Sequence, residues 1–203
     1  MIDLHQYQHL LATDISDAQS AGFAMDIGIQ SLWQPVPKLM GFAYTVSCRE
    51  RSNTYLHSAI YTAPKNAIIV AEVDANDYAV AGGNVCAVAK ENGIQGFIID
   101  GAIRDLGEVR DINFPVFARG VFPKPGGKIE AGASEVEIQC GGVTVNSGDL
   151  IVADEEGIVV VPAGEVEQVL TLAVEKKTKA ENTSLDQWRE SHFEKIRSIV
   201  PDK

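Results

Sequence analysis

An arginine and an aspartate, Arg104 and Asp105, stand side by side directly after an apolar run that ends at Asp100-Gly101. A guanidinium binds a carboxylate or an enolate through two hydrogen bonds, and a carboxylate is a hard oxygen ligand suited to Mg²⁺ or Mn²⁺. A surface ion pair is the alternative reading of such a dipeptide. The apolar run before it, together with a glycine-rich loop upstream, favours a site for an anion and a divalent metal ion.

The glycine-rich loop reads Gly82-Gly83-Asn84-Val85 and precedes a predicted helix. Free N–H groups at a helix N-terminus bind anions, so a substrate carboxylate fits there. A dinucleotide loop is excluded because the chain contains no Gly-x-Gly-x-x-Gly.

Further acidic residues fall near the ends of the same predicted strands, namely Asp74, Asp77 and Asp100. They could support a metal ion through water molecules, since Mg²⁺ keeps several of its own. They could equally be helix caps and turn formers, and Asp77 fits that role better.

The remaining residue types that could carry chemistry are dispersed. No spacing typical of a zinc site, a disulfide framework or a Ser–His–Asp arrangement occurs, and the thiols are expected to be buried and reduced. These residues are His5, His9, His57, His192, Cys48, Cys86 and Cys140.

The elements that must position Arg104 and Asp105 form a strand–helix–strand unit. Residues 66–73 and 96–100 are apolar and rich in β-branched side chains, which is typical of strands covered on both faces. Residues 85–92 between them predict a helix. This order predicts two parallel strands joined by a crossover. The loops at their carboxyl ends, 74–84 and 101–105, are where α/β sheets bind ligands.

The rest of the chain predicts more strands with helices at both termini. A glycine- and proline-rich loop is expected over 120–134, and the last helix is expected to pack either on its own domain or on a neighbouring subunit. The expected strands are 42–46, 115–118, 136–138, 143–145, 150–152 and 157–161; the expected helices are 4–11, 18–24, 53–61, 106–111, 166–173 and 184–196.

Composition limits the possible partners. With 28 acidic against 17 basic residues the formal charge is −11, which disfavours nucleic acid. The chain has no apolar run of membrane-spanning length and no signal-like N-terminus, so a cytoplasmic protein without a membrane partner is expected.

Taken together, several segments resemble the RraA-like family. The resemblance covers about residues 14 to 175 and rests on six segments in a fixed order. They are GFAYTV at 41–46, the Gly82-Gly83 loop, GFIIDGAIRD at 96–105, PVFARG at 115–120, GGVTV at 141–145 and GDLIVADEEG at 148–157.

The resemblance implies an α/β fold, a swivelling β/β/α domain with flanking terminal helices. It would be one domain over 1–203, with a helical extension at 176–203, assembled as a homotrimer or homohexamer. The family includes metal-dependent 4-hydroxy-4-methyl-2-oxoglutarate aldolases that also decarboxylate oxaloacetate, and non-catalytic regulators of a ribonuclease. The Arg-Asp pair, which the regulators typically lack, favours the enzymes.

Carried onto this sequence, the family pattern implies that Arg104 binds the pyruvyl group and stabilises its enolate. Asp105 would be the metal ligand for Mg²⁺ or Mn²⁺, and the backbone of Gly82, Gly83, Asn84 and Val85 would hold the carboxylate of a small 2-oxo acid. The chain departs from the pattern at Gly83, where the aldolases usually carry Asp or Glu.

That departure leaves alternatives open. Asp100 and Asp74 are candidates to take over the missing carboxylate's role. A neighbouring subunit is expected to add an acidic residue, for which Glu181, Glu190 and Glu194 are candidates. A non-catalytic regulator, or a lyase acting on a different 2-oxo or sugar acid, are the competing functions.

Overall fold

The computed structural model describes residues 2–200. Its centre is a nine-stranded sheet in the order β1-β6-β5-β3-β2-β10-β11, with β4 paired to β5 and β7 to β2, beside a separate β8-β9 hairpin. The strands are β1 Gln30–Ser31, β2 Leu39–Cys48, β3 Ile68–Val73, β4 Ala79–Ala81, β5 Gly96–Ile103, β6 Val116–Val121, β7 Gly132–Ser134, β8 Ile138–Cys140, β9 Val143–Val145, β10 Leu150–Asp154 and β11 Gly157–Val161. The helices are η1 Leu4–Tyr7, α1 Ala12–Ala18, α2 Thr54–Thr62, α3 Gly83–Glu91, α4 Leu106–Asp111, η2 Ala163–Glu165, α5 Val166–Glu181 and α6 Leu185–Ile199.

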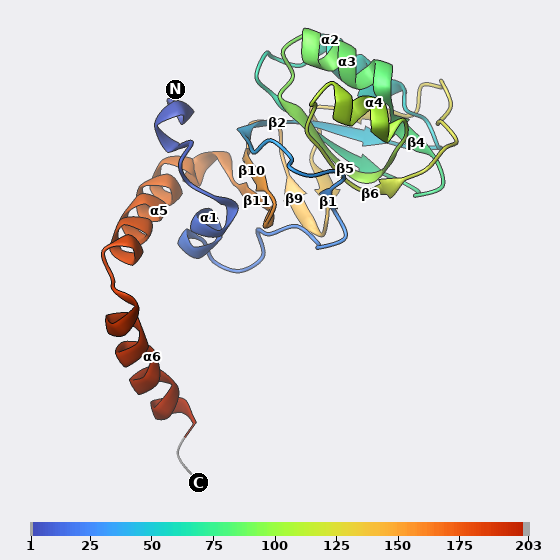
Figure 1. Ribbon diagram of the computed structural model, residues 1–203. Coiled ribbons are helices and arrows are strands. Elements are labelled where there is room, and N and C mark those ends of the chain that lie inside the picture. Colours follow the sequence, from blue (N-terminus) through green and yellow to red (C-terminus); the bar gives the residue numbers. More distant parts are fainter. Residues whose placement is uncertain (1, 201–203) are drawn as a thin grey trace.

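The parallel half of the sheet carries the predicted strand–helix–strand unit. β2, β3, β5 and β6 run parallel, and α2, α3 and α4 lie together over one face (Figure 1). Leu56, Cys86 and Val109, one from each helix, are fully buried against that face. The predicted strand–helix–strand unit is therefore confirmed as β3, α3 and β5. Strands with a continuous apolar run need cover on both faces of the sheet, and these helices cover one of them.

Two details of this half differ from the expectation. β5 continues to Ile103, so the predicted loop 101–105 shrinks to Arg104 and Asp105. Within the predicted loop 74–84, residues 79–81 form the short strand β4, which pairs with β5 through Ala79↔Ala102 and Ala81↔Ile103. Both changes place Arg104 at the end of a paired, buried strand.

The antiparallel half extends the same sheet. β10 pairs with β2 and β11 with β10, and α1 and α5 pack against them through Ile15 and Leu170. The β8-β9 hairpin covers the face of the parallel strands that the helices leave open, where Ile138 and Val145 join a second buried cluster. The site-bearing strands are thus enclosed on both faces.

The ends of the chain differ most from the sequence-based expectation. The predicted helix 4–11 is only the short η1, and the predicted helix 18–24 lies earlier, as α1. Asp14 caps Leu11 N and pairs with Lys177, which starts α1 there. The predicted loop 120–134 contributes β7, and the strand expected at 136–138 begins at Ile138.

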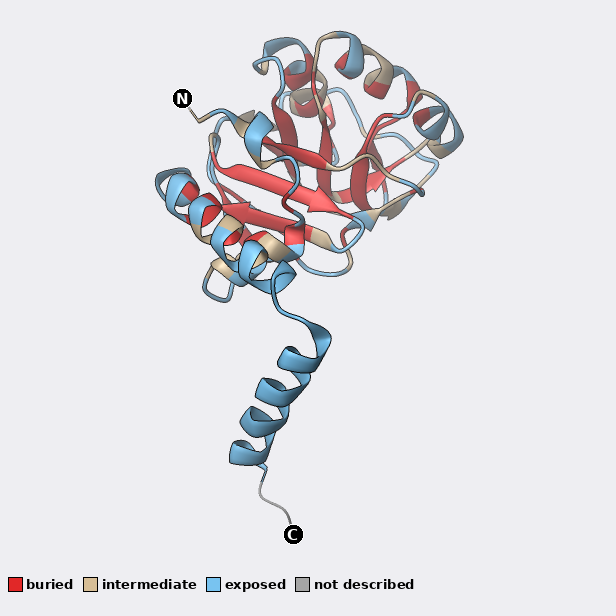
Figure 2. Cartoon of the chain, turned by 60° about the vertical axis from the view of Figure 1, so that its left-hand side comes forward, coloured by how far each residue is buried: buried red, intermediate tan, exposed pale blue. Residues whose placement is uncertain are grey.

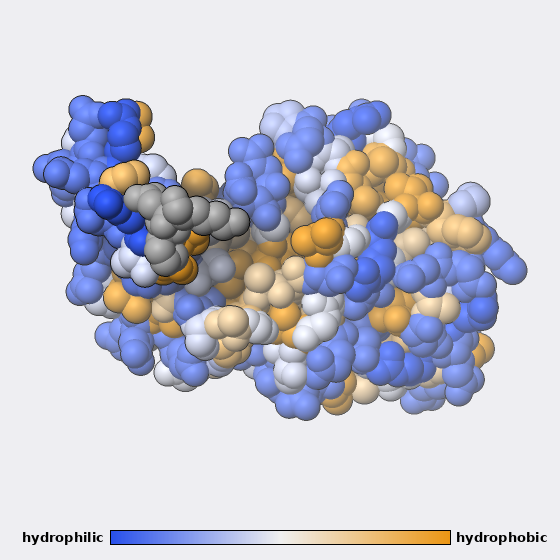
Figure 3. All heavy atoms as spheres, turned by 90° about the horizontal axis from the view of Figure 1, so that it is seen from below, coloured by the Kyte–Doolittle hydropathy of each residue, from blue (hydrophilic) through white to orange (hydrophobic). Residues whose placement is uncertain are grey.

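Helix α6 extends away from the body of the molecule, and each of its residues is exposed (Figure 2). This contradicts packing on its own domain, one of the two expected positions. Its Ser184 capping box with Gln187 is formed as predicted. Apolar side chains lie among the polar ones on this arm, as Figure 3 shows from below. Within residues 2–200, no helix is both long enough and apolar enough to cross a membrane.

Candidate active site

Arg104 and Asp105 are fixed by the backbone on both sides. Arg104 N–H donates to the carbonyl of Ala81 over 3.0 Å, which joins the end of β5 to the end of β4. Asp105 has φ 57° and ψ 38°, the left-handed conformation, and is the N-cap residue of α4. Aspartate tolerates this conformation better than most residues because its short polar side chain makes local hydrogen bonds. The turn therefore presents both side chains at the point where β5 ends.

Gly82 and Gly83 bring the start of α3 against these two side chains. A Cβ at Gly82 would lie 2.5 Å from Asp105 Oδ2 and 3.0 Å from Arg104 Cγ, so any other residue there would displace these two side chains. Gly83 N–H donates to Asp105 Oδ2 over 3.3 Å, and Arg104 Nε lies 3.4 Å from the same oxygen. The sequence prediction that these two loops meet is confirmed in space.

The meeting point opens into a pocket of about 270 Å³. It contains the predicted residues Gly82, Asn84, Val85, Arg104 and Asp105. It also contains residues that sequence reasoning did not assign to a site. Those are Asn53, His57, Ala79, Ala81, Pro125, Gly126 and Lys128.

Lys128, His57 and Asn53 form one wall of this pocket. Lys128 Nζ lies 2.7 Å from His57 Nδ1 and 2.5 Å from Asn53 Oδ1. Burial, followed by the neighbouring Lys128 charge, lowers the pKa of His57 to about 4. Burial likewise lowers the pKa of Lys128. His57 is therefore neutral at physiological pH. No local sequence pattern indicates this, because Lys128 lies 71 residues after His57 in the chain.

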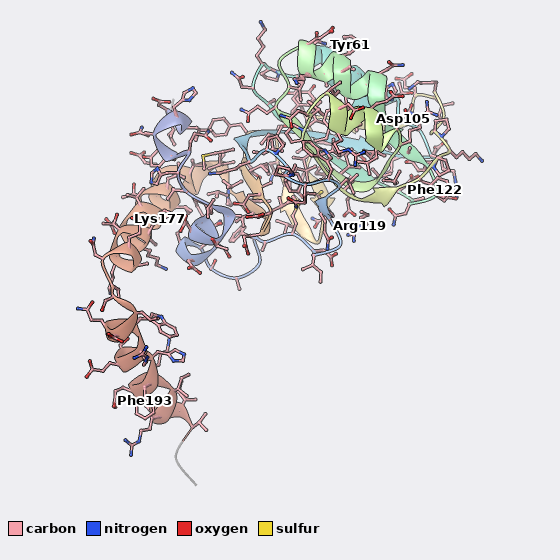
Figure 4. The ribbon with its side chains drawn as sticks, viewed as in Figure 1. Tyr61, Asp105, Arg119, Phe122, Lys177 and Phe193 are labelled. Atoms are coloured by element: carbon pink, nitrogen blue, oxygen red, sulfur yellow. The ribbon has the colours of Figure 1, made fainter. Side chains whose placement is uncertain are left out.

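The other acidic candidates do not join the pocket. Asp74 accepts a hydrogen bond from Tyr78 Oη over 2.7 Å, and Asp77 pairs with Arg51. Asp100 pairs with Arg119 and accepts from Gly141 N–H over 2.7 Å. Asp105 lies near α4, well apart from Arg119 at the lower edge of the sheet (Figure 4). None of these three aspartates is placed to replace a carboxylate at Gly83.

The carboxylate of Glu108 instead occupies the space where a side chain on residue 83 would lie. A Cβ at Gly83 would lie 1.9 Å from Glu108 Oε2, so the Glu108 side chain fills the space beside this glycine. Glu108 belongs to the first turn of α4, three residues after Asp105. Its spacing from Asp105 was the sequence signal that could have identified it, since residues three apart share a helix face.

A larger hollow of about 690 Å³ lies elsewhere, between α1, residues 24–31 and the β10-β11 turn. Two of its acidic residues, Asp26 and Asp154, already have hydrogen-bond partners. Asp26 accepts from Gly28 N–H and pairs with Arg119, while Asp154 accepts from Ala12 and Glu156 N–H. The smaller pocket brings Arg104, Asp105 and Lys128 together beside the α3 N-terminus and is the better candidate for chemistry.

The cysteines behave as expected. All three are free and buried, and burial raises the pKa of Cys48 to about 11 and that of Cys86 to about 12. They are neutral thiols rather than nucleophiles. Across residues 2–200, no group of three His, Cys, Asp or Glu side chains is gathered as a ready-made metal cage.

Comparison with known proteins matches this geometry to a family. The RraA-like family model, described as Aldolase/RraA, matches residues 12–160. The chain belongs to the RraA-like family. A Halalkalibacterium halodurans protein, provisionally named a 4-hydroxy-4-methyl-2-oxoglutarate aldolase, is 36% identical over 177 residues, covering 87% of this chain and 84% of that protein.

Solved structures share the mixed α/β fold of this chain. An uncharacterized protein from Pseudomonas syringae pv. tomato superposes with a TM-score of 0.77 at 30% identity, covering 93% of this chain and 92% of that one. The RNA-processing inhibitor RraA from Thermus thermophilis gives a TM-score of 0.68 at 26% identity, covering 74% of this chain and 91% of that one. The family thus includes proteins named as aldolases and a protein named as an inhibitor.

Proposed function

We propose that this RraA-like protein is a divalent-metal-dependent carbon–carbon lyase. It would cleave 2-oxo acids of the 4-hydroxy-4-methyl-2-oxoglutarate type to pyruvate and decarboxylate oxaloacetate, both through a pyruvate enolate. The observation that carries this proposal is the convergence of Arg104, Asp105 and the α3 N-terminus in one pocket. The aldolase names of its relatives agree with it.

The α3 N-terminus supplies the carboxylate subsite. The first N–H groups of a helix have no partner within it. Gly83 N–H is occupied by Asp105, and the first helical hydrogen bond is donated by Cys86 to Gly82. Within residues 2–200 the N–H groups of Asn84 and Val85 have no hydrogen-bond acceptor, so they can bind the substrate carboxylate, aided by the helix dipole.

Arg104 binds the oxygen on which charge develops. Its Nε contacts Asp105, while no hydrogen bond within residues 2–200 uses its Nη atoms. A fixed guanidinium stabilises an enolate oxygen more as its charge grows, which lowers the barrier rather than only tightening binding.

Asp105 fits a divalent metal ion of the Mg²⁺ or Mn²⁺ type. Its Oδ2 is engaged by Gly83 and Arg104, whereas Oδ1 has no hydrogen bond within the described chain. The absence of a three-residue cage suits these ions, which are commonly bound by one or two carboxylates with water and substrate oxygens. The ion would supply Lewis-acid polarisation of the 2-oxo group.

In the aldol substrate the C3–C4 bond breaks, its electron pair moves into the 2-oxo group as an enolate, and the C4 hydroxyl loses its proton as it becomes a carbonyl. Protonation of the enolate at C3 gives pyruvate. In oxaloacetate the bond to the C4 carboxylate breaks instead, releasing CO₂ and the same enolate. One enolate subsite thus serves both reactions.

The test is pyruvate release from both substrates by protein stripped with a chelator and then resupplied with Mg²⁺ or Mn²⁺. Metal-dependent turnover that is lost in Arg104→Ala supports the proposal. Folded protein without turnover on either substrate would overturn it. The competing function, a non-catalytic regulator, instead predicts that Arg104→Ala changes no measurable property; the Thermus thermophilis neighbour is named as an RNA-processing inhibitor.

We further propose assembly into a homotrimer or homohexamer. The exposed apolar side chains of α6 favour packing of this helix against a second copy of the chain. They belong to Leu185, Trp188, Phe193, Ile196 and Ile199. Light scattering on the full chain tests this proposal, and a monomeric mass would reject it.

A further inference from the structure

The exposed helix α6 carries a stripe of apolar and aromatic side chains along one face. Leu185, Trp188, His192, Ile196 and Ile199 follow one another at spacings of three or four residues, which places them on the same side of the helix. The rings of Trp188 and His192 stack within this α6 stripe, with centroids 4.5 Å apart. The stripe runs for about 21 Å, at about 1.5 Å per residue. Such a face is typical of a helix that packs against protein.

The charged residues of α6 are unevenly distributed around the stripe. Arg189 and Lys195 border it on opposite sides, each about 60° from its centre at about 100° per residue. Arg189 also pairs with Asp186 over 2.8 Å, and exposed ion pairs of this kind are weak. The remaining charged residues lie farther round the helix, namely Asp186, Glu190, Glu194 and Arg197. The stripe therefore has a positively charged border.

The larger hollow, between α1, residues 24–31 and the β10-β11 turn, has the complementary character. Its volume is about 690 Å³, and its lining combines apolar side chains such as Met25, Ile27 and Ile158 with acidic residues and includes no lysine or arginine. Ile27 is 87% exposed. Glu155 and Glu156 are exposed at the turn, and neither carboxylate has an ion pair within residues 2–200. The hollow thus offers an uncovered apolar surface beside two unpaired acids.

Helix α6 leaves the hollow of its own chain open, since it extends away from the body and each of its residues is exposed (Figure 2). Yet α1 and residues 24–31 lie on the side of the body from which α6 extends (Figure 1). Seen from that side, apolar side chains lie in the recess between the α6 arm and the body (Figure 3). Two copies that meet on this side can each place α6 against the hollow of the other.

We propose that α6 of one copy of this chain docks in the hollow of a second copy. The α6 stripe then covers the apolar lining, and Arg189 and Lys195 lie beside Glu155 and Glu156. A second copy fits as the occupant because the chain itself supplies both complementary surfaces, and contacts of this kind build homo-oligomers. The inference rests on the proposed assembly and deepens it by assigning the surface that receives α6; it does not depend on the lyase reaction.

Charge reversal on each side of the contact tests this assignment. Arg189→Glu/Lys195→Glu and Glu155→Lys/Glu156→Lys each bring like charges together, so each should raise the dissociation constant of the assembly about tenfold or more. Light scattering over a dilution series measures it. The chain that carries all four changes pairs opposite charges again and should recover most of the affinity. The matched control is Glu91→Lys/Asp111→Lys, at exposed positions outside the hollow, which should assemble as the parent protein does.

The outcomes separate this inference from the assembly itself. Unchanged affinity in Glu155→Lys/Glu156→Lys, while removal of α6 still lowers the mass, would leave assembly through α6 standing and overturn the hollow as its receiving surface. Failure of the four-change chain to recover affinity, with melting temperatures as in the parent protein, would overturn it as well. A monomeric parent protein would reject both the assembly and this contact.

Cross-linking provides a second test that needs no substitution. A carbodiimide joins an ammonium to a carboxylate in contact with it, so Lys195 should be joined to Glu155 or Glu156. When isotope-labelled and unlabelled copies are mixed, dissociated and reassembled, mass spectrometry should find joined peptides that combine the two labels. Joined peptides of a single label only would place α6 against its own chain and contradict the proposal. Joining of Lys195 to carboxylates outside the hollow would contradict it too.

Discussion

The carboxylate of Glu108 stands where a side chain on residue 83 would begin, with Oε2 1.9 Å from the position of a Cβ at Gly83. Glu108 and Asp105 both belong to the start of α4, and both lie against the Gly82-Gly83 pair. The acidic group that the family pattern leads one to expect at position 83 therefore has a counterpart on the neighbouring helix. Its role in holding a metal ion is open to a direct test.

Substitutions at positions 83 and 108 should distinguish the effect of the Glu108 side-chain volume from the effect of its negative charge. Glu108→Gln is expected to weaken Mn²⁺ binding about tenfold, as is common for a group that supports a metal site. Gly83→Asp alone should lower the melting temperature because its Cβ collides with Glu108. The double variant Gly83→Asp/Glu108→Ala removes the closest contact, that with Glu108 Oε2, and should recover part of the stability and of the Mn²⁺ affinity, measured by thermal unfolding and calorimetry.

Glu91→Gln is the control for this exchange, since it removes an exposed acid from α3 without touching the pocket. Unchanged Mn²⁺ affinity in Glu108→Gln would show that Glu108 only fills space.

Asp105→Asn should abolish metal binding without disturbing the fold. Asparagine tolerates the left-handed conformation, and its side-chain oxygen can still accept from Gly83 N–H. We expect at least a tenfold loss of Mn²⁺ affinity and near-complete loss of turnover, with an unchanged melting temperature. Asp105→Ala loses the hydrogen bond from Gly83 N–H and places alanine in a left-handed conformation, so it should also lose about 1 kcal/mol or more of stability. Retained Mn²⁺ affinity in Asp105→Asn would show that the Asp105 carboxylate is not the metal ligand.

Arg104→Lys should reduce turnover while metal binding persists. Lysine keeps the charge but not the planar fork that fits an enolate and a carboxylate. A fall in kcat of about 10²–10³-fold is expected, the range for removing one donor to a developing negative charge. Arg110→Lys, on the exposed side of α4, is the control. A normal kcat in Arg104→Lys would mean that the guanidinium does not act on the transition state.

Stability should decline in acid because of His57. Its pKa is lowered from 6.5 to about 4 in the folded protein, so between these values the unfolded chain binds a proton that the native state does not. The free energy of unfolding therefore falls as pH drops from 6.5 to 4. Urea titrations at pH 7 and pH 5 should show a smaller decline in His57→Gln. His5→Gln, at an exposed position, should decline like the parent protein.

Truncation before α6 should separate folding from assembly. Among residues 185–199 none is buried, so a chain ending at Thr183 should retain its free energy of unfolding to within about 1 kcal/mol, as for surface changes. Its mass by light scattering should fall if α6 holds copies together. Unchanged assembly would place the interface elsewhere on the body.

The sequence was informative where a single segment determines its own structure. The apolar runs of β3 and β5 predicted two buried parallel strands, and the positions of Gly82 and Arg104 at their ends predicted a shared pocket. Asp74, Asp77 and Asp100 fall at the same strand ends, yet ion pairs and hydrogen bonds with Arg51, Tyr78 and Arg119 keep them out of it. Such partners come from distant segments and leave no local pattern.

The pocket wall formed by Asn53, His57 and Lys128 could not be predicted for the same reason. Asn53, His57 and Lys128 come from the start of α2 and from a loop more than seventy residues later. Only the folded chain brings them together. β4 was also missed, since three residues give too short a period to predict a strand.

The left-handed turn at Asp105 has an evolutionary consequence. The residues that this backbone accepts most readily are aspartate, asparagine and glycine, and aspartate codons reach the codons of both others by a single base change. One nucleotide is thus enough to remove the carboxylate while the turn, the neighbouring strand and the overall architecture persist. A lineage with this fold can abandon its chemistry without a structural trace and keep the scaffold for other use.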